Sequence, residues 1–411
     1  MEKLQPVRGT KDLFGEDYDK HEVIISIAKR IASLYGYQGI STPIFEFSNI
    51  FKRSLGESSD VVGKEMYSFF DKGNEEITLR PEFTASICRA YISNGFQQLL
   101  PLKLFTHGPL FRYERPQKGR QRQFHQLNYE FLGPGNPAID AEMIAMAACL
   151  LSKLGILEKT SLELNSLGCS ETRKSYQKSL TEYLKDFAHD LSDDSKVRLT
   201  KNPLRILDSK NSNDRKIIAN APKISDYFSN EADDFFKSLQ EYLTLMGIKF
   251  NLNSSLVRGL DYYNHTSFEF VTDALGAQGT VLGGGRYNGL IKLLGGDSTE
   301  GIGFAAGIER LSMLYDDMPS KIRSCAVIAS TPNQRIKSME IANELRKNDI
   351  AIYFDAGAKF DKALKNAIKE NCRFAIFVGE EELKDGSVKL KDLDSRIEEV
   401  IKIDNLSQRV S

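Results

Sequence analysis

The sequence predicts a chain of several domains that combines α+β and α/β architecture. Residues 110–133 alternate between apolar and polar side chains on both sides of a basic loop, which is the pattern of a β-hairpin. From residue 168 to 251, helical segments rich in lysine and aspartate dominate and indicate a helical insertion. After residue 323 strands alternate with helices, which is typical of an α/β domain with a largely parallel sheet.

The composition is that of a soluble globular protein, with 41% hydrophobic and 27% charged residues in a chain of 411. A net charge of −1 provides no general attraction to nucleic acid, so any RNA contact must come from local patches. No apolar run approaches the roughly 20 residues of a membrane span, and the first residues lack the apolar core of a signal peptide. The five cysteines and five histidines are scattered, so we expect no structural zinc site and a reducing cytoplasm.

The first third of the chain mixes helices with short strands. Apolar residues at helical spacing predict a helix over 20–35, and residues 38–47 predict a strand. Pro43 lies inside that strand, which favours a place at a sheet edge. A second hairpin is expected over residues 65–79, followed by a helix that begins near Thr84.

The hairpin at 110–133 has the most informative pattern, because successive side chains of a strand point to opposite faces. One face is predicted to be polar and carries Leu110, Arg112, Glu114, Phe124, Gln126, Asn128 and Glu130. The other face is predicted to pack into a core and carries Phe111, Tyr113, Leu127, Tyr129 and Phe131. The loop over 115–122 holds four cations and no acid, which suits a polyanionic ligand such as ATP or an RNA end. From periodicity alone, an ordinary solvated hairpin is an equally good interpretation.

The last third contains two glycine-rich runs, residues 283–289 and 301–307. Adjacent glycines allow a backbone to approach a ligand closely, but these runs lack the G-K-[ST] of a P-loop and the spacing of a dinucleotide fingerprint. On their own they favour tight turns. Residues 318–320 are predicted to form a linker before the C-terminal strands and helices.

Several of these segments together resemble class II aminoacyl-tRNA synthetases. The helix and strand that end at Thr42-Pro43 are similar to motif 1, FRYE (111–114) with its returning strand to motif 2, and GFAAGIERL (303–311) to motif 3. The runs LVRGLDYY (256–263) and GGGRYNG (283–289) resemble the histidyl-tRNA synthetase family, and RPQKGR (115–120) resembles its bacterial form. The resemblance covers essentially the whole chain.

This resemblance implies a domain organisation and an activity. It implies a catalytic domain over 1–320, with a class II antiparallel sheet flanked by helices and interrupted by the insertion at 168–251, and an anticodon-binding domain over 323–411. It implies ATP-dependent activation of L-histidine to histidyl-adenylate and transfer of histidine to the 3′ end of tRNA(His). Mg²⁺ bound with ATP, no tightly bound metal and a homodimer are expected. Such chemistry needs no protein nucleophile, because catalysis consists of positioning and of stabilising charge on phosphoryl oxygens.

Site residues follow from the same resemblance. Catalysis is assigned to Arg112 and Arg258, both at the α-phosphate. Histidine binding is assigned to Glu82, Phe83, Thr84, Arg112, Gln126, Glu130, Arg258, Tyr262 and Tyr263. ATP binding is assigned to Arg112, Glu114, Arg120, Phe124 and Arg310, and the tRNA acceptor end to Arg115 and Gln117. Glu130 and Tyr263 are expected to bond the two imidazole nitrogens, and Phe83 stands where bacterial relatives often carry glycine.

A second interpretation is the regulatory subunit of ATP phosphoribosyltransferase, which is a histidine-binding module without tRNA charging. Such proteins typically lack the anticodon-binding domain and have lost residues that contact ATP. Here Arg112, Glu114, Arg258 and Arg310 are all present, and the C-terminal domain is complete. These residues favour the synthetase.

Overall fold

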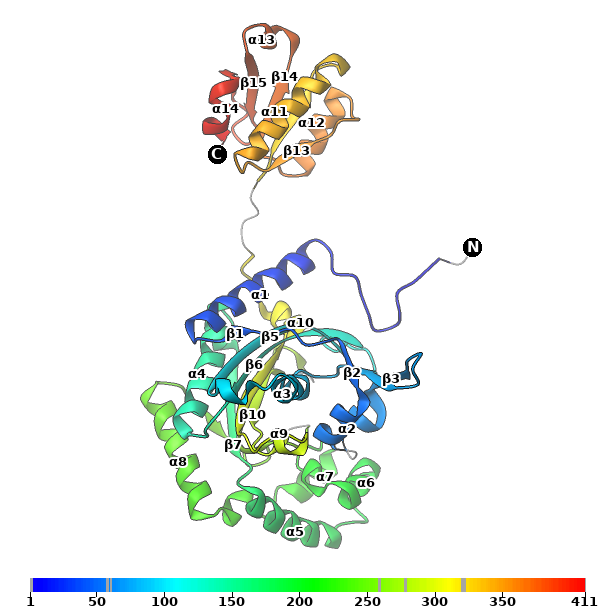
Figure 1. The fold of residues 1–411 in the computed structure, drawn as a ribbon, viewed down its shortest axis with the longest axis vertical. Coiled ribbons are helices and arrows are strands. Elements are labelled where there is room, and N and C mark those ends of the chain that lie inside the picture. Colours follow the sequence, from blue (N-terminus) through cyan, green and yellow to red (C-terminus); the bar gives the residue numbers. More distant parts are fainter. Residues whose placement is uncertain are drawn as a thin grey trace. The chain divides into compact units, whose positions relative to one another are not determined.

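The chain divides into two compact units, Met1–Met318 and Pro319–Ser411 (Figure 1). A computed structural model describes residues 3–56, 59, 61–257, 260–276, 279–318 and 323–410. Most of the predicted linker lies outside these residues. No helix in the described ranges is long and apolar enough to cross a membrane.

The first unit is built on an eight-stranded sheet in which most neighbouring strands are antiparallel. Across the sheet the order is β1 (Gln38–Gly39), β5 (Leu102–Phe111), β6 (Gln123–Leu132), β11 (Gly301–Gly307), β10 (Thr280–Arg286), β9 (Asn264–Val271), β7 (Ser161–Ser166) and β8 (Asn251–Leu252). The two outermost pairs, β1 with β5 and β7 with β8, are parallel. A separate small sheet has the order β2 (Phe45–Phe47), β4 (Glu76–Leu79) and β3 (Tyr67–Phe70).

Two hydrophobic cores lie against the large sheet. The first joins the sheet to α1 (Glu16–Leu34), α4 (Pro137–Lys153), α8 (Asn230–Leu245) and α10 (Ile308–Leu314). The second joins it to α2 (Ser48–Leu55), α3 (Thr84–Ser93) and α9 (Leu290–Leu293). Leu127, Tyr129 and Phe131 of β6 enter the first core, so the alternation predicted for this strand is confirmed. Each fully buried side chain of this size stabilises the fold by about 1.5–3 kcal/mol.

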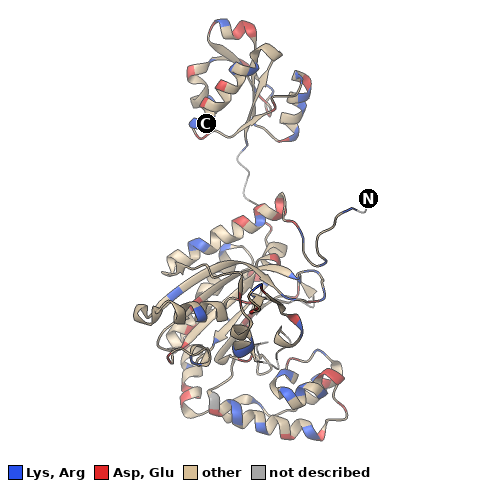
Figure 2. Ribbon diagram, turned by 45° about the vertical axis from the view of Figure 1, so that its right-hand side comes forward, with Lys and Arg blue, Asp and Glu red and all other residues tan. Residues whose placement is uncertain are grey.

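The predicted helical insertion follows β7. It contains α5 (Ser170–Asp186), α6 (Asp193–Lys201), α7 (Ser212–Ile218) and α8. In Figure 1, α5, α6 and α7 lie together at one end of the unit, and in Figure 2 the same helices carry both positive and negative side chains. Ser192 and Asn211 cap α6 and α7 by accepting backbone N–H groups with their side chains. These caps explain why the short, polar segments form helices.

The second unit is the predicted α/β domain. Its sheet has the order β13 (Ile352–Phe354), β12 (Cys325–Ala329), β14 (Phe374–Val378), β15 (Ser387–Asp392) and β16 (Glu398–Lys402). The first three strands are parallel, and the last two are added antiparallel. Alternate residues of β12 enter separate cores against α11 (Arg335–Lys347) and α12 (Phe360–Lys369). A central strand covered on both faces is the expected form of such a sheet.

Two predictions about strands are wrong. The strand predicted over 38–47 is divided between β1 and β2, which belong to different sheets. The side chain of Arg80 donates hydrogen bonds to the carbonyls of Thr42 and Pro43, at 2.7 and 3.3 Å, and so holds the crossing segment. The outgoing strand of the main hairpin ends at Phe111, so Arg112 and Glu114 do not share a strand face with Leu110.

Candidate active site

A cavity of about 400 Å³ lies on the face of the large sheet that carries Gln126 and Asn128. Strands β6, β10 and β11 contribute residues to it, as do the segments before α3 and after β5. The predicted site residues that line it are Glu82, Phe83, Thr84, Arg112, Glu114, Arg120, Phe124, Gln126, Tyr262, Tyr263 and Arg310. The cavity therefore brings together groups from four distant parts of the sequence.

One end of the cavity is formed by the start of α3. The two carboxylate oxygens of Glu82 accept the backbone N–H groups of Thr84 and Ala85, both at 2.7 Å. These are N–H groups that a helix cannot pair internally, and the positive end of the helix favours a carboxylate here. The hydroxyl of Tyr262 donates to Glu82 Oε2 at 3.4 Å. Burial raises the pKa of Glu82, and the backbone hydrogen bonds oppose this shift.

Glu130 lies behind this end and does not line the cavity itself. Its side chain is 1% exposed, and its carboxylate accepts hydrogen bonds from the hydroxyls of Thr84 at 2.6 Å and Tyr287 at 2.5 Å. Burial raises the pKa of Glu130 to about 7, although both hydroxyls lower it. A carboxylate has about four acceptor sites, so Glu130 keeps the capacity to accept a further N–H group.

The other end of the cavity is rich in arginine. Arg310 NH1 donates to the carbonyl of Thr280 at 2.6 Å, and Glu309 accepts the backbone N–H of His125 at 2.9 Å, which ties the start of α10 to β6. Burial lowers the pKa of Arg310, and the neighbouring cations Arg120 and Arg112 lower it further. Like charges held this close repel one another, so an anion bound between them would be stabilised.

Two aromatic rings pack against arginines at this site. The guanidinium of Arg112 lies 5.3 Å from the ring centre of Phe124, and its Nε donates to the carbonyl of Pro81 at 2.9 Å. Arg80 lies 4.5 Å from the ring centre of Phe83, which is 1% exposed. Phe83 is therefore packed into the second core and meets the cavity with only a small part of its surface.

The loop after β5 has some predicted residues in the cavity and some outside it. Arg120 lines the cavity and forms an ion pair with Glu114, whereas Arg115 and Gln117 are exposed and do not line the cavity. The backbones of Gln117 and Arg120 exchange two hydrogen bonds, at 3.0 and 2.9 Å, which close the tip of the loop. Arg258 lies outside the described residues.

Comparison with known proteins identifies the family. Residues 9–311 match the family model described as histidyl-tRNA synthetase. The chain is 51% identical to histidine--tRNA ligase of Rickettsia bellii (strain RML369-C) over 401 residues, which are 97% of each chain. The chain belongs to the histidyl-tRNA synthetase family. The prediction of this family, and with it the preference over the regulatory subunit, is confirmed.

Solved structures agree with this assignment to the histidyl-tRNA synthetase family. The crystal structure of apo histidyl-tRNA synthetase from S. aureus matches with a TM-score of 0.84 and 33% identity, covering 99% of this chain and 100% of that one. A structure described as an ATP phosphoribosyltransferase regulatory subunit/histidyl-tRNA synthetase from Bacillus halodurans shares the fold, with a TM-score of 0.64, 21% identity, and coverage of 92% of this chain and 98% of that one. Residues 324–411 match the model of an anticodon binding domain. The predicted fold class is confirmed.

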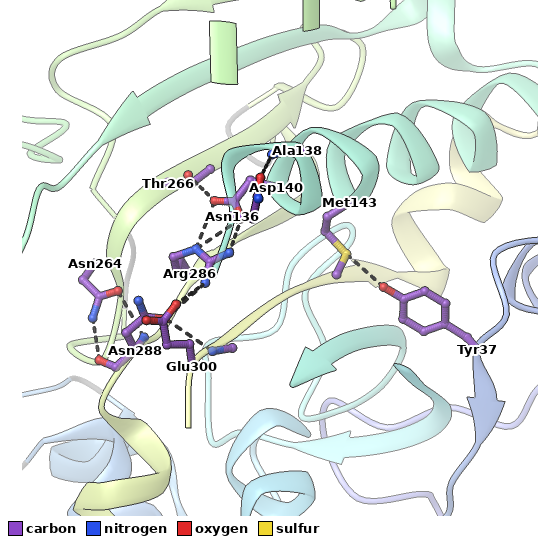
Figure 3. Close-up of polar contacts among 11 residues, drawn as sticks. Tyr37, Asn136, Ala138, Asp140, Met143, Asn264, Thr266, Arg286, Asn288 and Glu300 are labelled. Atoms are coloured by element: carbon purple, nitrogen blue, oxygen red, sulfur yellow. Dashed lines mark hydrogen bonds and ion pairs between the residues drawn. The ribbon is translucent and has the colours of Figure 1, made fainter. Parts of the chain in front are cut away.

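The structure contains a buried ion pair that was not predicted from the sequence. Arg286 of β10 and Asp140 of α4 are 1% and 0% exposed and form an ion pair (Figure 3). Thr266 donates to Asp140 at 2.5 Å, and Arg286 also reaches Glu300 at 3.2 Å. This ion pair holds the end of β10 directly before Tyr287, whose hydroxyl donates a hydrogen bond to Glu130. The only sequence signal for the ion pair was Arg286-Tyr287 within GGGRYNG (283–289), which we interpreted only as a family motif.

The insertion also contributes to the cavity. Arg205, Asp208 and Lys210, which precede α7, line it together with Glu269 of β9. Burial raises the pKa of Asp208, and the negative charge of Glu269 adds to the shift. No sequence pattern distinguished these residues from the other charged residues of the insertion.

Proposed function

We propose that this chain is a histidine–tRNA ligase in which one cavity holds histidine and ATP side by side. The observation that carries this proposal is that the lining of one cavity combines two kinds of groups. Glu82, Thr84 and the tyrosines suit an amino acid, and the arginines suit a triphosphate. The carboxylate of histidine attacks the α-phosphate of ATP in line, which forms histidyl-adenylate and releases pyrophosphate.

The histidine end would recognise the ligand by its polar groups. Glu82, Thr84 and Gln126 hold the α-amino group, and Glu130 and Tyr263 accept or donate at the two imidazole nitrogens. Tyr262 and Phe83 complete the pocket walls. A site with buried polar partners rejects analogues that lack the matching group by about 10⁴–10⁵, because those partners would be left unpaired.

The ATP end would bind phosphates through arginine, which is always charged and can bind oxygens in pairs. Arg112 contacts the α-phosphate and the histidine carboxylate, Arg310 the γ-phosphate and Arg120 the outer phosphates. Glu114 bonds the adenine edge, and Phe124 stacks on the ring. Because Arg120 is bound to Glu114 in this structure, nucleotide binding would exchange that partner for a phosphate.

Mg²⁺ would arrive with ATP. Among the described residues there is no group of three or more His, Cys, Asp and Glu side chains that could hold a metal ion. Mg²⁺ is usually bound through one or two carboxylates together with substrate phosphates. Asp208 and Glu269 line the cavity and fit this requirement.

The proposal extends to tRNA and to assembly. Residues 1–320, with the insertion at 168–251, would form the catalytic domain, and residues 323–411 would bind the anticodon of tRNA(His) in the cytoplasm. Arg115 and Gln117 are exposed on their loop, where they can reach the acceptor end.

A homodimer would cover an apolar surface on the small sheet. There Phe45, Phe47 and Phe69 share one face and are between 47% and 56% exposed, and side chains of this kind are enriched at interfaces. Sedimentation of the intact chain as a monomer at micromolar concentration would argue against this assembly.

Histidine-dependent exchange of pyrophosphate into ATP tests the activity directly. We expect exchange with histidine and with none of the other amino acids. Arg310→Ala should abolish it, whereas Lys178→Ala, an exposed cation on α5, should leave it unchanged. If the intact chain binds histidine but shows no exchange with Mg²⁺ and ATP present, the ligase proposal is wrong.

A further inference from the structure

The helical insertion makes polar contacts with the segment that carries the pocket tyrosines. Arg173 of α5 donates from NH1 to the carbonyl of Tyr263 at 2.7 Å and to that of Asp261 at 3.2 Å. Asn202, directly after α6, donates from Nδ2 to Asp261 Oδ1 at 2.8 Å. We call these three hydrogen bonds the insertion clasp. Within the clasp, Arg173 holds the backbone carbonyls on both sides of Tyr262, and Asn202 holds the carboxylate of Asp261.

The gripped segment forms part of the histidine end of the cavity. Tyr262 and Tyr263 are each 7% exposed, and their ring centres are 4.7 Å apart. Tyr262 also reaches the carboxylate of Glu82. A small shift of this backbone would therefore move both tyrosines, and it would break the hydrogen bond between Tyr262 and Glu82.

On the insertion side of the clasp, buried side chains and hydrogen bonds hold Asn202 in place. Leu204, Ile206 and Leu207 follow Asn202 and are buried in the same core as the two tyrosines. Asp214 accepts hydrogen bonds from Ser195 at 2.6 Å and Ser209 at 2.5 Å, and so joins α6 to α7. Because Asn202 lies between these anchored parts, its amide is held in position to bond Asp261.

We propose that the helical insertion is a positioning element of the histidine pocket, in which Arg173 and Asn202 hold Tyr262 and Tyr263 in the arrangement that binds the amino acid. This inference rests on the proposed function for the identity of the amino acid. By linkage, histidine binding and the docking of the insertion strengthen each other to the same degree. Arg205 and Lys210 line the cavity from the same insertion, so its placement also shapes the wall opposite the sheet.

Substitution of Asn202 tests the clasp without touching the cavity lining. A hydrogen bond to a charged group is stronger than one between neutral groups, so Asn202→Ala should raise the KM for histidine in pyrophosphate exchange by about tenfold. The KM for ATP should change less than twofold. A matched control is Asn213→Ala, which removes a hydrogen bond to the carbonyl of Asp190 elsewhere in the insertion and should change neither constant.

A second variant separates positioning from simple destabilisation. Asn202→Asp places a carboxylate against Asp261 and should weaken histidine binding at least as much, whereas the exchanged pair Asn202→Asp/Asp261→Asn restores the hydrogen bond and should recover most of the loss. A histidine KM that stays within twofold in both single variants would overturn the proposal, and so would equal increases for histidine and ATP. Titration calorimetry of histidine with the same variants keeps the test independent of catalysis, because it applies even if the unmodified chain shows no exchange.

Discussion

Replacement of Glu130 by glutamine should change how the stability of the protein depends on pH. Glu130 is 1% exposed and bonded by two hydroxyls, and burial raises its pKa from the 4.5 of an ordinary glutamate to about 7. Each unit of pKa corresponds to about 1.4 kcal/mol. The difference between folded and unfolded states is therefore worth about 3 kcal/mol.

The sign follows from proton uptake. Between pH 4.5 and 7 the folded protein keeps a proton on Glu130 that the unfolded chain has lost, so the folded state binds more protons. The contribution of this group to the free energy of unfolding is fully present below pH 4.5. It is lost as the pH rises to 7 and stays lost above that. Glutamine cannot titrate and therefore lacks this decrease.

Urea unfolding followed by circular dichroism at pH 5, 6, 7 and 8 measures the effect. All other titrating groups are common to both proteins. The free energy of unfolding of the unmodified chain minus that of Glu130→Gln therefore isolates the contribution of Glu130. This difference in free energy of unfolding should fall by about 2–3 kcal/mol from pH 5 to pH 8. Glu182→Gln, at an exposed position on α5, is the control and should give a constant difference. A constant difference for Glu130→Gln as well would refute the raised pKa.

Three further predictions test other parts of the molecule. Asp140→Asn leaves the fully buried Arg286 without its carboxylate and should lower the free energy of unfolding by about 3–5 kcal/mol, whereas Glu300→Gln, at its half-exposed partner, should cost less than about 1 kcal/mol. Arg258→Ala should slow adenylate formation far more than it weakens histidine binding, and equal losses in single-turnover and equilibrium measurements would show a binding role only. Removal of residues 323–411 should leave exchange measurable but impair tRNA charging, and unchanged charging would contradict the anticodon role.

The alternation of β6 was predictable because Leu127, Tyr129 and Phe131 on one face of this strand are buried. Leu127 and Tyr129 fill the first core, and Phe124 and Gln126 on the opposite parity line the cavity. A slip by one residue would reverse every side chain, so burial of one face specifies the register strongly. The periodicity of the sequence contains this information.

The end of β5 was not predictable from periodicity. Arg112 N–H still donates to the carbonyl of Arg122 at 2.9 Å, but Tyr113 N–H donates to the carbonyl of Glu65 at 2.7 Å. Glu65 lies 48 positions before Tyr113 in the chain, so no local sequence pattern predicts this hydrogen bond. Arg112 and Glu114 nevertheless line the cavity, because this long-range bond redirects the chain across its rim.

The insertion shows a second limit of the sequence. The helical insertion was predicted from segments rich in lysine and aspartate, but Arg173 and Asn202 are ordinary polar residues in such a context. Their importance arises only from the partners they meet, Asp261 and Tyr263, which lie about 60 to 90 positions later. A contact between two separately folded segments leaves no periodicity in either.

The glycine runs lead to a different physical conclusion from the one that the sequence suggested. We interpreted them as tight turns or as places where a backbone approaches a ligand. Gly289 does form a turn, because its φ is 100° and it directly precedes α9. The other glycines, at positions 283–285, 301, 303 and 307, lie within β10 and β11, and at several of them the missing side chain makes room for neighbouring residues. A Cβ at Gly303 would collide with the carboxylate of Glu130, and one at Gly285 would lie 3.0 Å from the ring of Tyr263. Gly303 and Gly285 therefore contribute to the histidine pocket indirectly. Because they lack side chains, Glu130 of β6 and Tyr263, which directly precedes β9, can occupy the space beside these strands.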